Sequence, residues 1–200
     1  MVTGIIMASG FSTRLNRDKL LLDIAGTPLI EHIILAAKKS CLDEVVLVYR
    51  KEQIKNLAEK NQITAVFNAD AREGQSSAIK AGIKASDADT SAYMFIVGDQ
   101  PMLTAKTIDC LVKAFLQNPQ SIIVPDYAGQ RGNPVIFPVS LQNELIKLTG
   151  DNGGRSIIKA RSDLILSVLF SDKNAGLDID IPEDYEQIRK LFGQPPGLSF

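Results

Sequence analysis

Short apolar runs alternate along this chain with longer stretches in which apolar residues recur at helical spacing. The runs are rich in β-branched residues and predict buried strands, and the amphipathic stretches predict helices. We expect strands at residues 4–8, 44–49, 64–67, 92–97, 121–124, 134–137 and 165–170. We expect helices at residues 29–39, 51–60, 76–85, 105–116, 142–148, 154–160 and 183–192, with Pro28 in the first turn of the first helix.

Alternation of strands and helices predicts an α/β domain with a mostly parallel sheet and helices on both faces. We expect one domain over residues 1–192, without internal repeats, followed by a loosely attached tail at residues 193–200. Ligands of such sheets bind at the carboxyl ends of the strands. The turns after residues 4–8 and 92–97 are therefore the first candidates for a ligand-binding or catalytic site.

The composition is that of an ordinary soluble domain, with 45% apolar and 22% charged residues and a net charge of −1. This balance predicts neither a nucleic-acid nor a membrane partner. Cys41 and Cys110 are far apart in sequence, which argues against a disulfide framework or a zinc site and favours a reducing cytoplasm. We identify no signal peptide and no apolar run near the ~20 residues that span a bilayer.

The first candidate site is the turn after residues 4–8, which contains Ala8, Ser9, Gly10, Arg14 and Lys19. Small residues let backbone N–H groups approach an anion, and two cations at fixed distance can neutralise it. The spacing matches neither the P-loop nor the Gly-x-Gly-x-x-Gly dinucleotide fingerprint. A glycine turn with solvated basic residues is the alternative, but the surrounding string favours phosphate binding.

The second candidate site is Gly98-Asp99-Gln100-Pro101, which follows the strand at 92–97. A carboxylate at the end of a buried strand projects into the crevice above the sheet. There it suits Mg²⁺, which binds one or two carboxylates together with substrate phosphates. The alternative is a turn or helix-capping aspartate, with Thr104 capping the following helix.

Four further segments are less specific. Gly74, Gln75 and Ser76 begin a helix whose polar start either meets a base or ribose or is simply a cap. Asp180 is either a second metal ligand or a helix cap, with Glu183 and Asp184 as helix-start residues. The remaining loop candidates are Arg131-Gly132-Asn133-Pro134 and Gly150-Asp151-Asn152-Gly153-Gly154-Arg155. We interpret His32, the single histidine, as structural.

Taken together, these strings resemble the molybdenum cofactor cytidylyltransferase family, within the MobA-like nucleotidyltransferase group. The resemblance extends from Ile5 to Tyr185. Guanylyltransferase relatives typically carry a double glycine in the first loop and Gly-Asp-Met-Pro in the second. Ser9 and Gln100 therefore favour the cytidylyl branch. Ile181 replaces a usual threonine, which removes a possible capping hydroxyl.

The resemblance implies a Rossmann-like three-layer nucleotidyltransferase fold, with the nucleotide in the N-terminal half and the acceptor over the C-terminal half. It implies catalytic roles for Arg14 at the β- and γ-phosphates and for Lys19 at the α-phosphorus. It implies Mg²⁺ held by Asp99 and Asp180. The implied nucleotide-binding residues are Ala8, Ser9, Gly10, Arg14, Lys19, Gly74, Gln75, Ser76 and Asp99. The implied acceptor-binding residues are Gln100, Arg131, Asn133, Asp151 and Arg155.

The implied reaction is transfer of CMP from CTP to the terminal phosphate of molybdopterin, with release of pyrophosphate. The dinucleotide cofactor would then pass to a hydroxylase of the xanthine dehydrogenase type in a transient complex. The alternatives are a GTP-dependent guanylyl branch and a cytidylyltransferase for another phosphate acceptor. A non-catalytic cofactor-delivery chaperone is disfavoured, since a carrier needs no cations and carboxylates for a departing pyrophosphate.

Overall fold

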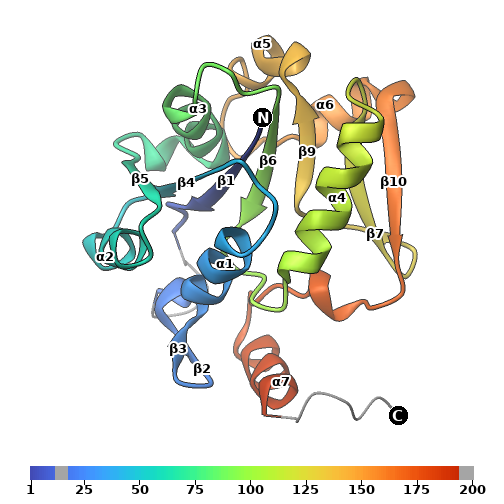
Figure 1. Ribbon diagram of the computed structural model, residues 1–200. Helices are drawn as coiled ribbons and strands as arrows, with labels where there is room; N and C mark the ends of the chain where they lie inside the picture. The colour runs from blue at the N-terminus through green and yellow to red at the C-terminus, as the bar shows by residue number, and fades with distance from the viewer. Residues whose placement is uncertain (12–17, 194–200) are drawn as a thin grey trace.

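A twisted central sheet organises the protein in a computed structural model that describes residues 1–11 and 18–193 (Figure 1). Within those residues the strand order is β10-β7-β9-β6-β1-β4-β5, with β8 paired to β7. The strands are β1 (Val2–Ala8), β4 (Glu44–Tyr49), β5 (Thr64–Phe67), β6 (Ala92–Val97), β7 (Ile122–Tyr127), β8 (Gln130–Arg131), β9 (Val135–Pro138) and β10 (Ile165–Phe170). A separate two-stranded ribbon pairs β2 (Asp23–Ile24) with β3 (Thr27–Pro28).

Parallel pairing dominates the centre of the sheet. β1 lies between β4 and β6 and is parallel to both, and β5 and β10 each run parallel to their neighbours. Strand β9 is antiparallel to β6 and β7 and separates the two parallel groups. The predicted mostly parallel α/β sheet is confirmed.

Helices cover both faces, as expected for the three-layer architecture (Figure 1). They are α1 (Leu29–Lys38), α2 (Glu52–Lys60), α3 (Gln75–Ala85), α4 (Ala105–Gln117), α5 (Gln142–Leu145), α6 (Arg155–Ala160) and α7 (Pro182–Phe192). One core cluster joins the sheet to α1, α2, α4 and α7, and the other joins it to α3, α5 and α6. Within the described residues, every helix is too short or too polar to cross a membrane.

The alternation of side chains along β1 explains why its sequence is apolar at consecutive positions. Ile6 packs into the α1/α4 cluster, whereas Ile5 packs into the α3 cluster, and both are fully buried. Successive residues of a strand point to opposite faces, so a strand covered on both sides needs an unbroken apolar run. Such a strand is fixed rigidly at its carboxyl end, where the first candidate turn begins.

Some local predictions were wrong. Pro28 is not in the first turn of α1; it lies one position before that helix and pairs in β3. Helix α5 ends at Leu145 rather than at 148, and the β2–β3 ribbon was not predicted. Short two-residue strands and four-residue helices carry too few residues for a periodic pattern to show.

Three smaller predictions are confirmed. Thr104 caps α4, since its hydroxyl accepts from the Thr107 N–H at 3.1 Å. His32 is structural: its Nε2 lies 3.0 Å from the carbonyl oxygen of Ile24, and its ring packs edge-on against Phe192. Asp184 serves the start of α7 by accepting from the Ile181 N–H at 3.0 Å.

Candidate active site

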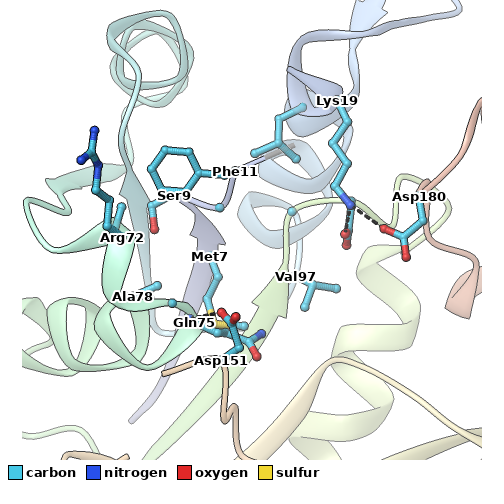
Figure 2. Close-up of a pocket in the computed structure, with 16 residues that line it drawn as sticks. Met7, Ser9, Phe11, Lys19, Arg72, Gln75, Ala78, Val97, Asp151 and Asp180 are labelled. Atoms are coloured by element: carbon cyan, nitrogen blue, oxygen red, sulfur yellow. Dashed lines mark hydrogen bonds and ion pairs between the residues drawn. The ribbon is translucent and has the colours of Figure 1, made fainter. Parts of the chain in front are cut away.

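A pocket of about 830 Å³ opens at the carboxyl ends of β1 and β6 (Figure 2). Their register pairs Met7 with Val97, so the turns that follow these two strands lie side by side. The pocket is lined by Met7, Ser9, Gly10, Phe11, Lys19, Leu20, Ala71, Arg72, Gly74, Gln75, Ala78, Val97, Gly98, Asp99, Asp151 and Asp180. The predicted location, at the carboxyl ends of parallel strands, therefore coincides with this pocket.

The turn after β1 forms one wall. Ala8 ends the strand and is buried, while Ser9 and Gly10 line the pocket. Arg14, predicted to bind phosphates, lies outside the described residues. The small side chains leave backbone groups accessible from the pocket, which is the property that anion binding requires.

Ser9 is held by a buried polar network beneath the pocket. The Nδ2 of Asn68 donates to the hydroxyls of Ser9 and Ser77, both at 2.9 Å. Ser77 in turn donates to the carbonyl of Gly74 at 2.7 Å. Each polar side chain in this network is more than nine-tenths buried. The network ties the turn after β1 to the end of β5 and the start of α3, three segments that frame one end of the pocket.

Lys19 lies at the opposite end of the pocket. It begins a short 3₁₀ helix, Lys19–Leu21. The Leu20 N–H in the first turn of this helix donates to Oδ1 of Asp18 at 3.1 Å. Its Nζ donates to Oδ2 of Asp99 at 2.7 Å and to Oδ1 of Asp180 at 2.9 Å. Figure 2 shows Lys19 and Asp180 pointing toward each other across the pocket mouth.

Backbone bonds bring the two aspartates together from distant parts of the chain. The Ile179 N–H donates to the Asp99 carbonyl at 3.2 Å, which fixes the segment before α7 against the turn after β6. The Asp180 N–H donates to Asp184 at 2.9 Å. The N-cap of α7 is Ile181, which has no capping side-chain bond, so Asp180 is not the helix cap. Its carboxylate pairs with Lys19, and its role as a second metal ligand stays a prediction.

Nearby charges and burial shift the pKa values of Lys19 and Asp178. Burial alone would lower the pKa of Lys19, but Asp99 and Asp180 outweigh it, and the pKa lies above its ordinary value. Burial, and then the negative charges of Asp99 and Asp180, raise the pKa of Asp178. Lys19 is therefore a fixed positive charge at neutral pH within a carboxylate-rich corner.

The donor set at this corner fits a hard divalent cation. Asp99 and Asp180 each bring a carboxylate oxygen within 3 Å of the same ammonium nitrogen. Such oxygens suit Mg²⁺, which normally completes its shell with water and substrate phosphate. Among the described residues, no three carboxylate, histidine or cysteine side chains are grouped as a complete metal cage. A cation here would therefore depend on the substrate for further ligands.

The start of α3 connects the two halves of the domain. Gly74 has a φ of +87°, and a Cβ atom at this position would lie within 3 Å of Gly150 and Asp151. Oδ1 of Asp151 accepts from the Gln75 N–H at 3.3 Å, and the Gly150 carbonyl accepts from the Ser76 N–H at 3.1 Å. Asp151, predicted to bind the acceptor, thus lies beside residues predicted to bind the nucleotide.

The other predicted acceptor residues do not line this pocket. Gln100 is buried and donates from Nε2 to the Gly176 carbonyl at 3.2 Å. Arg131 is exposed on β8, and the Asn133 carbonyl accepts from the Tyr127 hydroxyl at 2.8 Å. Arg155 is exposed at the start of α6. Of the predicted nucleotide-binding residues, Ala8 and Ser76 are buried behind the pocket wall.

Sequence reasoning missed Phe11, Arg50, Asn68 and Arg72. Phe11 lines the pocket with nearly half of its surface exposed, and the Arg50 guanidinium lies 4.2 Å from the centre of its ring. Arg72 lines the same end of the pocket. Phe11 could have been predicted, because it directly follows Ser9 and Gly10 in the sequence. Arg50 and Asn68 follow β4 and β5, and only the parallel pairing of those strands with β1 shows their relevance.

Comparison with known proteins agrees with this geometry. A family model for the MobA-like NTP transferase domain matches residues 4–164. The purine catabolism protein PucB of Bacillus subtilis is 28% identical over 203 residues, covering 94% of this chain and 95% of PucB. The molybdenum cofactor cytidylyltransferase of Escherichia coli is 26% identical over 188 residues, covering 90% and 92%. A probable molybdenum cofactor guanylyltransferase of Thermococcus sibiricus is 33% identical over 128 residues, covering 62% and 61%.

Solved structures show the same fold over nearly the whole chain. A homologue of Mycobacterium tuberculosis Rv0371c from Mycobacterium sp. strain JC1 has a TM-score of 0.82 at 25% identity and covers 96% of both chains. The Rv0371c structure in complex with manganese has a TM-score of 0.78 at 21% identity and covers 94% of this chain and 98% of that one.

The α/β sheet, with a pocket at the carboxyl ends of its central strands, is the architecture of a nucleotidyltransferase. The chain belongs to the MobA-like NTP transferase family, as its motifs indicated, and it is a nucleotidyltransferase of that family.

Proposed function

We propose that this enzyme is a Mg²⁺-dependent cytidylyltransferase that transfers CMP from CTP to the terminal phosphate of molybdopterin. The observation that carries the proposal is Lys19, which is held between Asp99 and Asp180 at the pocket mouth. One cation and two carboxylates that meet beside the carboxyl ends of β1 and β6 can bind both a triphosphate and its metal counter-ion. The named cytidylyltransferase relative, which is similar over 90% of this chain, supports the choice of reaction.

In this proposal a phosphate oxygen of the acceptor forms a bond to the α-phosphorus of CTP. The bond from that phosphorus to the bridging oxygen of the β-phosphate breaks, and pyrophosphate leaves with the electron pair. Negative charge grows on the α-phosphate oxygens and on the leaving group. Phosphoryl transfer is catalysed largely by positioning and by electrostatic stabilisation of this charge.

The chain's own residues divide this work. Lys19 stabilises the charge at the α-phosphorus, and Arg14 binds the β- and γ-phosphates. Backbone amides of the Ser9-Gly10 turn approach the phosphates. The base and ribose lie toward Gly74, Gln75 and Ser76, and Asp151 borders the acceptor. Gln100, Arg131, Asn133 and Arg155 belong to the proposed acceptor half, although they lie away from the described pocket.

Asp99 and Asp180 would hold Mg²⁺. When bound, the ion supplies charge neutralisation for the triphosphate and the departing pyrophosphate. The manganese complex of the structural relative Rv0371c supports a divalent cation at this fold. A cytoplasmic location and a transient complex with a molybdenum hydroxylase complete the proposal, since the product is a cofactor for other enzymes.

The choice of base is open to one specific alternative. A relative named as a guanylyltransferase is 33% identical over 128 residues, so GTP is the second candidate donor. Ser9 and Gln100 favour CTP because guanylyl relatives typically have glycine and methionine there. Another phosphate acceptor is a further variant of the same chemistry.

Thermal unfolding with CTP, GTP, ATP and UTP, each with and without Mg²⁺, tests the donor. A ligand at 100 times its Kd stabilises a protein by about 2.7 kcal/mol, which shifts the Tm of a domain this size measurably. We expect a shift selective for CTP with Mg²⁺, and then pyrophosphate release on addition of molybdopterin. A GTP-selective shift would assign the guanylyl branch, and no shift with any nucleotide would contradict the proposal.

A further inference from the structure

Lys19 is in contact with the residues proposed to hold the metal ion. Its Nζ lies 2.7 Å from Asp99, in the turn after β6, and 2.9 Å from Asp180, in the segment before α7. The Lys19 side chain is 18% exposed, and the two carboxylates are 22% and 47% exposed. The ammonium therefore occupies the space between the two oxygens, partly shielded from water.

A divalent cation bound by the same two oxygens would need nearly the same space. Mg²⁺ binds carboxylate oxygens at about 2.0–2.1 Å, so an ion shared by Asp99 and Asp180 would lie between them. Lys19 is an ammonium ion at neutral pH, and both of its contacts are charged hydrogen bonds to the carboxylates. An ammonium and a divalent cation that share the same two carboxylate oxygens would repel each other strongly at these distances.

The Lys19 side chain can change its conformation while the backbones of the three residues stay in place. The Asp99 carbonyl is bonded to Ile179, and the Asp180 N–H is bonded to Asp184, so both backbones are fixed. The backbone after Lys19 is fixed by the buried Leu20. The lysine side chain has four rotatable carbon–carbon bonds and can turn its ammonium toward the pocket interior.

We propose that Lys19 and the divalent cation compete for Asp99 and Asp180, so that the metal enters when a nucleotide phosphate draws Lys19 away. This inference rests on the proposed function, in which Lys19 contacts the phosphates. In the nucleotide-free enzyme, Lys19 neutralises the carboxylates. In the loaded enzyme, the phosphates neutralise Lys19 and the metal neutralises the carboxylates.

Competition of this kind makes metal and nucleotide binding interdependent. Because linkage is reciprocal, a nucleotide that removes Lys19 from the carboxylates strengthens metal binding, and metal binding strengthens nucleotide binding by the same factor. The enzyme would then hold little metal when it has no substrate. Lys19 serves both states, first as counter-ion and then as phosphate ligand.

The test measures the affinity of the nucleotide-free enzyme for Mn²⁺ by electron paramagnetic resonance. We expect Lys19→Met, which keeps the length of the side chain without its charge, to bind Mn²⁺ about tenfold or more tightly than wild type, within the range of typical coupled sites. Lys19→Gln keeps a hydrogen-bond donor and should show the same gain. Circular dichroism confirms that each variant is folded.

The chain offers a matched control in α2. Lys55 also lies between two carboxylates, 2.8 Å from Glu52 and 3.6 Å from Glu59, but it does not line the pocket. Lys55→Met should bind Mn²⁺ as wild type does. Combining Lys19→Met with Asp180→Asn should remove the gain, because the second carboxylate is then lost.

Equal Mn²⁺ affinity in wild type and both Lys19 variants would overturn the competition, and so would a gain that survives Asp180→Asn. Neither result would affect the transferase assignment, which pyrophosphate release tests on its own. If no variant binds Mn²⁺, the carboxylate pair is not a metal site and the inference fails. The Mg²⁺ requirement of pyrophosphate release would then decide whether the metal part of the proposed function also fails.

Discussion

The two ends of the predicted site differ in how the fold assembles them. At the donor end, Lys19, Asp99 and Asp180 come from distant segments of the chain. A carboxylate oxygen of each aspartate lies within 3 Å of the Lys19 Nζ. At the acceptor end, Arg131 and Arg155 are exposed on β8 and α6 and do not line the pocket. Only Asp151, among the five predicted acceptor residues, lies in it.

This difference follows from the position of each segment relative to the sheet. Lys19 and Asp99 follow β1 and β6, which are adjacent, parallel and buried on both faces, so their carboxyl ends meet at one edge. Asp180 reaches them because the Ile179 N–H donates to the Asp99 carbonyl. Arg131, Asn133 and Arg155 lie in or beside short, peripheral elements whose direction the sequence pattern does not reveal. A motif at the end of a central strand can be placed from sequence, whereas one in a peripheral loop cannot.

The largest expected effect is on Lys19, at the donor end. Lys19→Met should lower kcat about 10²- to 10³-fold, the usual loss when one group that stabilises transition-state charge is removed. KM for the nucleotide should change less, because the contact is strongest in the transition state. Steady-state pyrophosphate release measures both constants. An effect confined to KM would show that Lys19 only binds the ground state.

Asn68 tests the framework beneath the donor end. Asn68→Ala removes the bonds to Ser9 and Ser77 and leaves buried hydroxyls with fewer partners. We expect the free energy of unfolding to fall by about 1–3 kcal/mol. This corresponds to a decrease in Tm of about 2–4 °C per kcal/mol, measurable by calorimetry. Nucleotide KM should rise as well, since Ser9 is no longer held. An unchanged Tm would mean that the network contributes nothing to stability.

Asp151 tests the point where the two ends meet. Its carboxylate accepts from the first N–H of α3, and a charge at such a position contributes about 0.3–1 kcal/mol. Asp151→Ala should therefore lower the Tm by no more than about 1–4 °C. The matched variant is Asp163→Ala, which removes a carboxylate that does not line the pocket, and it should lower the Tm less than Asp151→Ala does. A loss of stability as large as that of Asn68→Ala would show that the loop is a main support of α3.

The smallest effect should come from the outlying acceptor residues. Arg131→Ala and Arg155→Ala should leave the Kd for CTP unchanged in calorimetric titration, because neither side chain lines the donor pocket. Their effect, if the acceptor half is as proposed, should appear only in KM for molybdopterin. Weaker CTP binding in either variant would remove the contrast between the two ends of the site.

The positions of the central strands could be predicted from the sequence. The apolar runs of β1, β4 and β6 predicted their positions, and Ser9, Gly10 and Asp99 line a pocket at the strand ends where the sequence placed them. The antiparallel direction of β9 was not predictable, because direction leaves no mark on a four-residue apolar run. The buried position of Gln100 was also not evident, since its bond to Gly176 depends on how the segment before α7 returns to the sheet.

The central claim is that the carboxylates around Lys19 belong to a nucleotidyl-transfer centre. The most direct test compares pyrophosphate release from CTP, with Mg²⁺ and molybdopterin, in wild type, Asp99→Asn and Asp178→Asn. Asp99 is bonded to Lys19, whereas Asp178 shares the charged environment and does not line the pocket. We predict that Asp99→Asn reduces the rate about 10²-fold or more while Asp178→Asn stays near wild type. Equal rates in wild type and in a folded Asp99→Asn variant would contradict the claim.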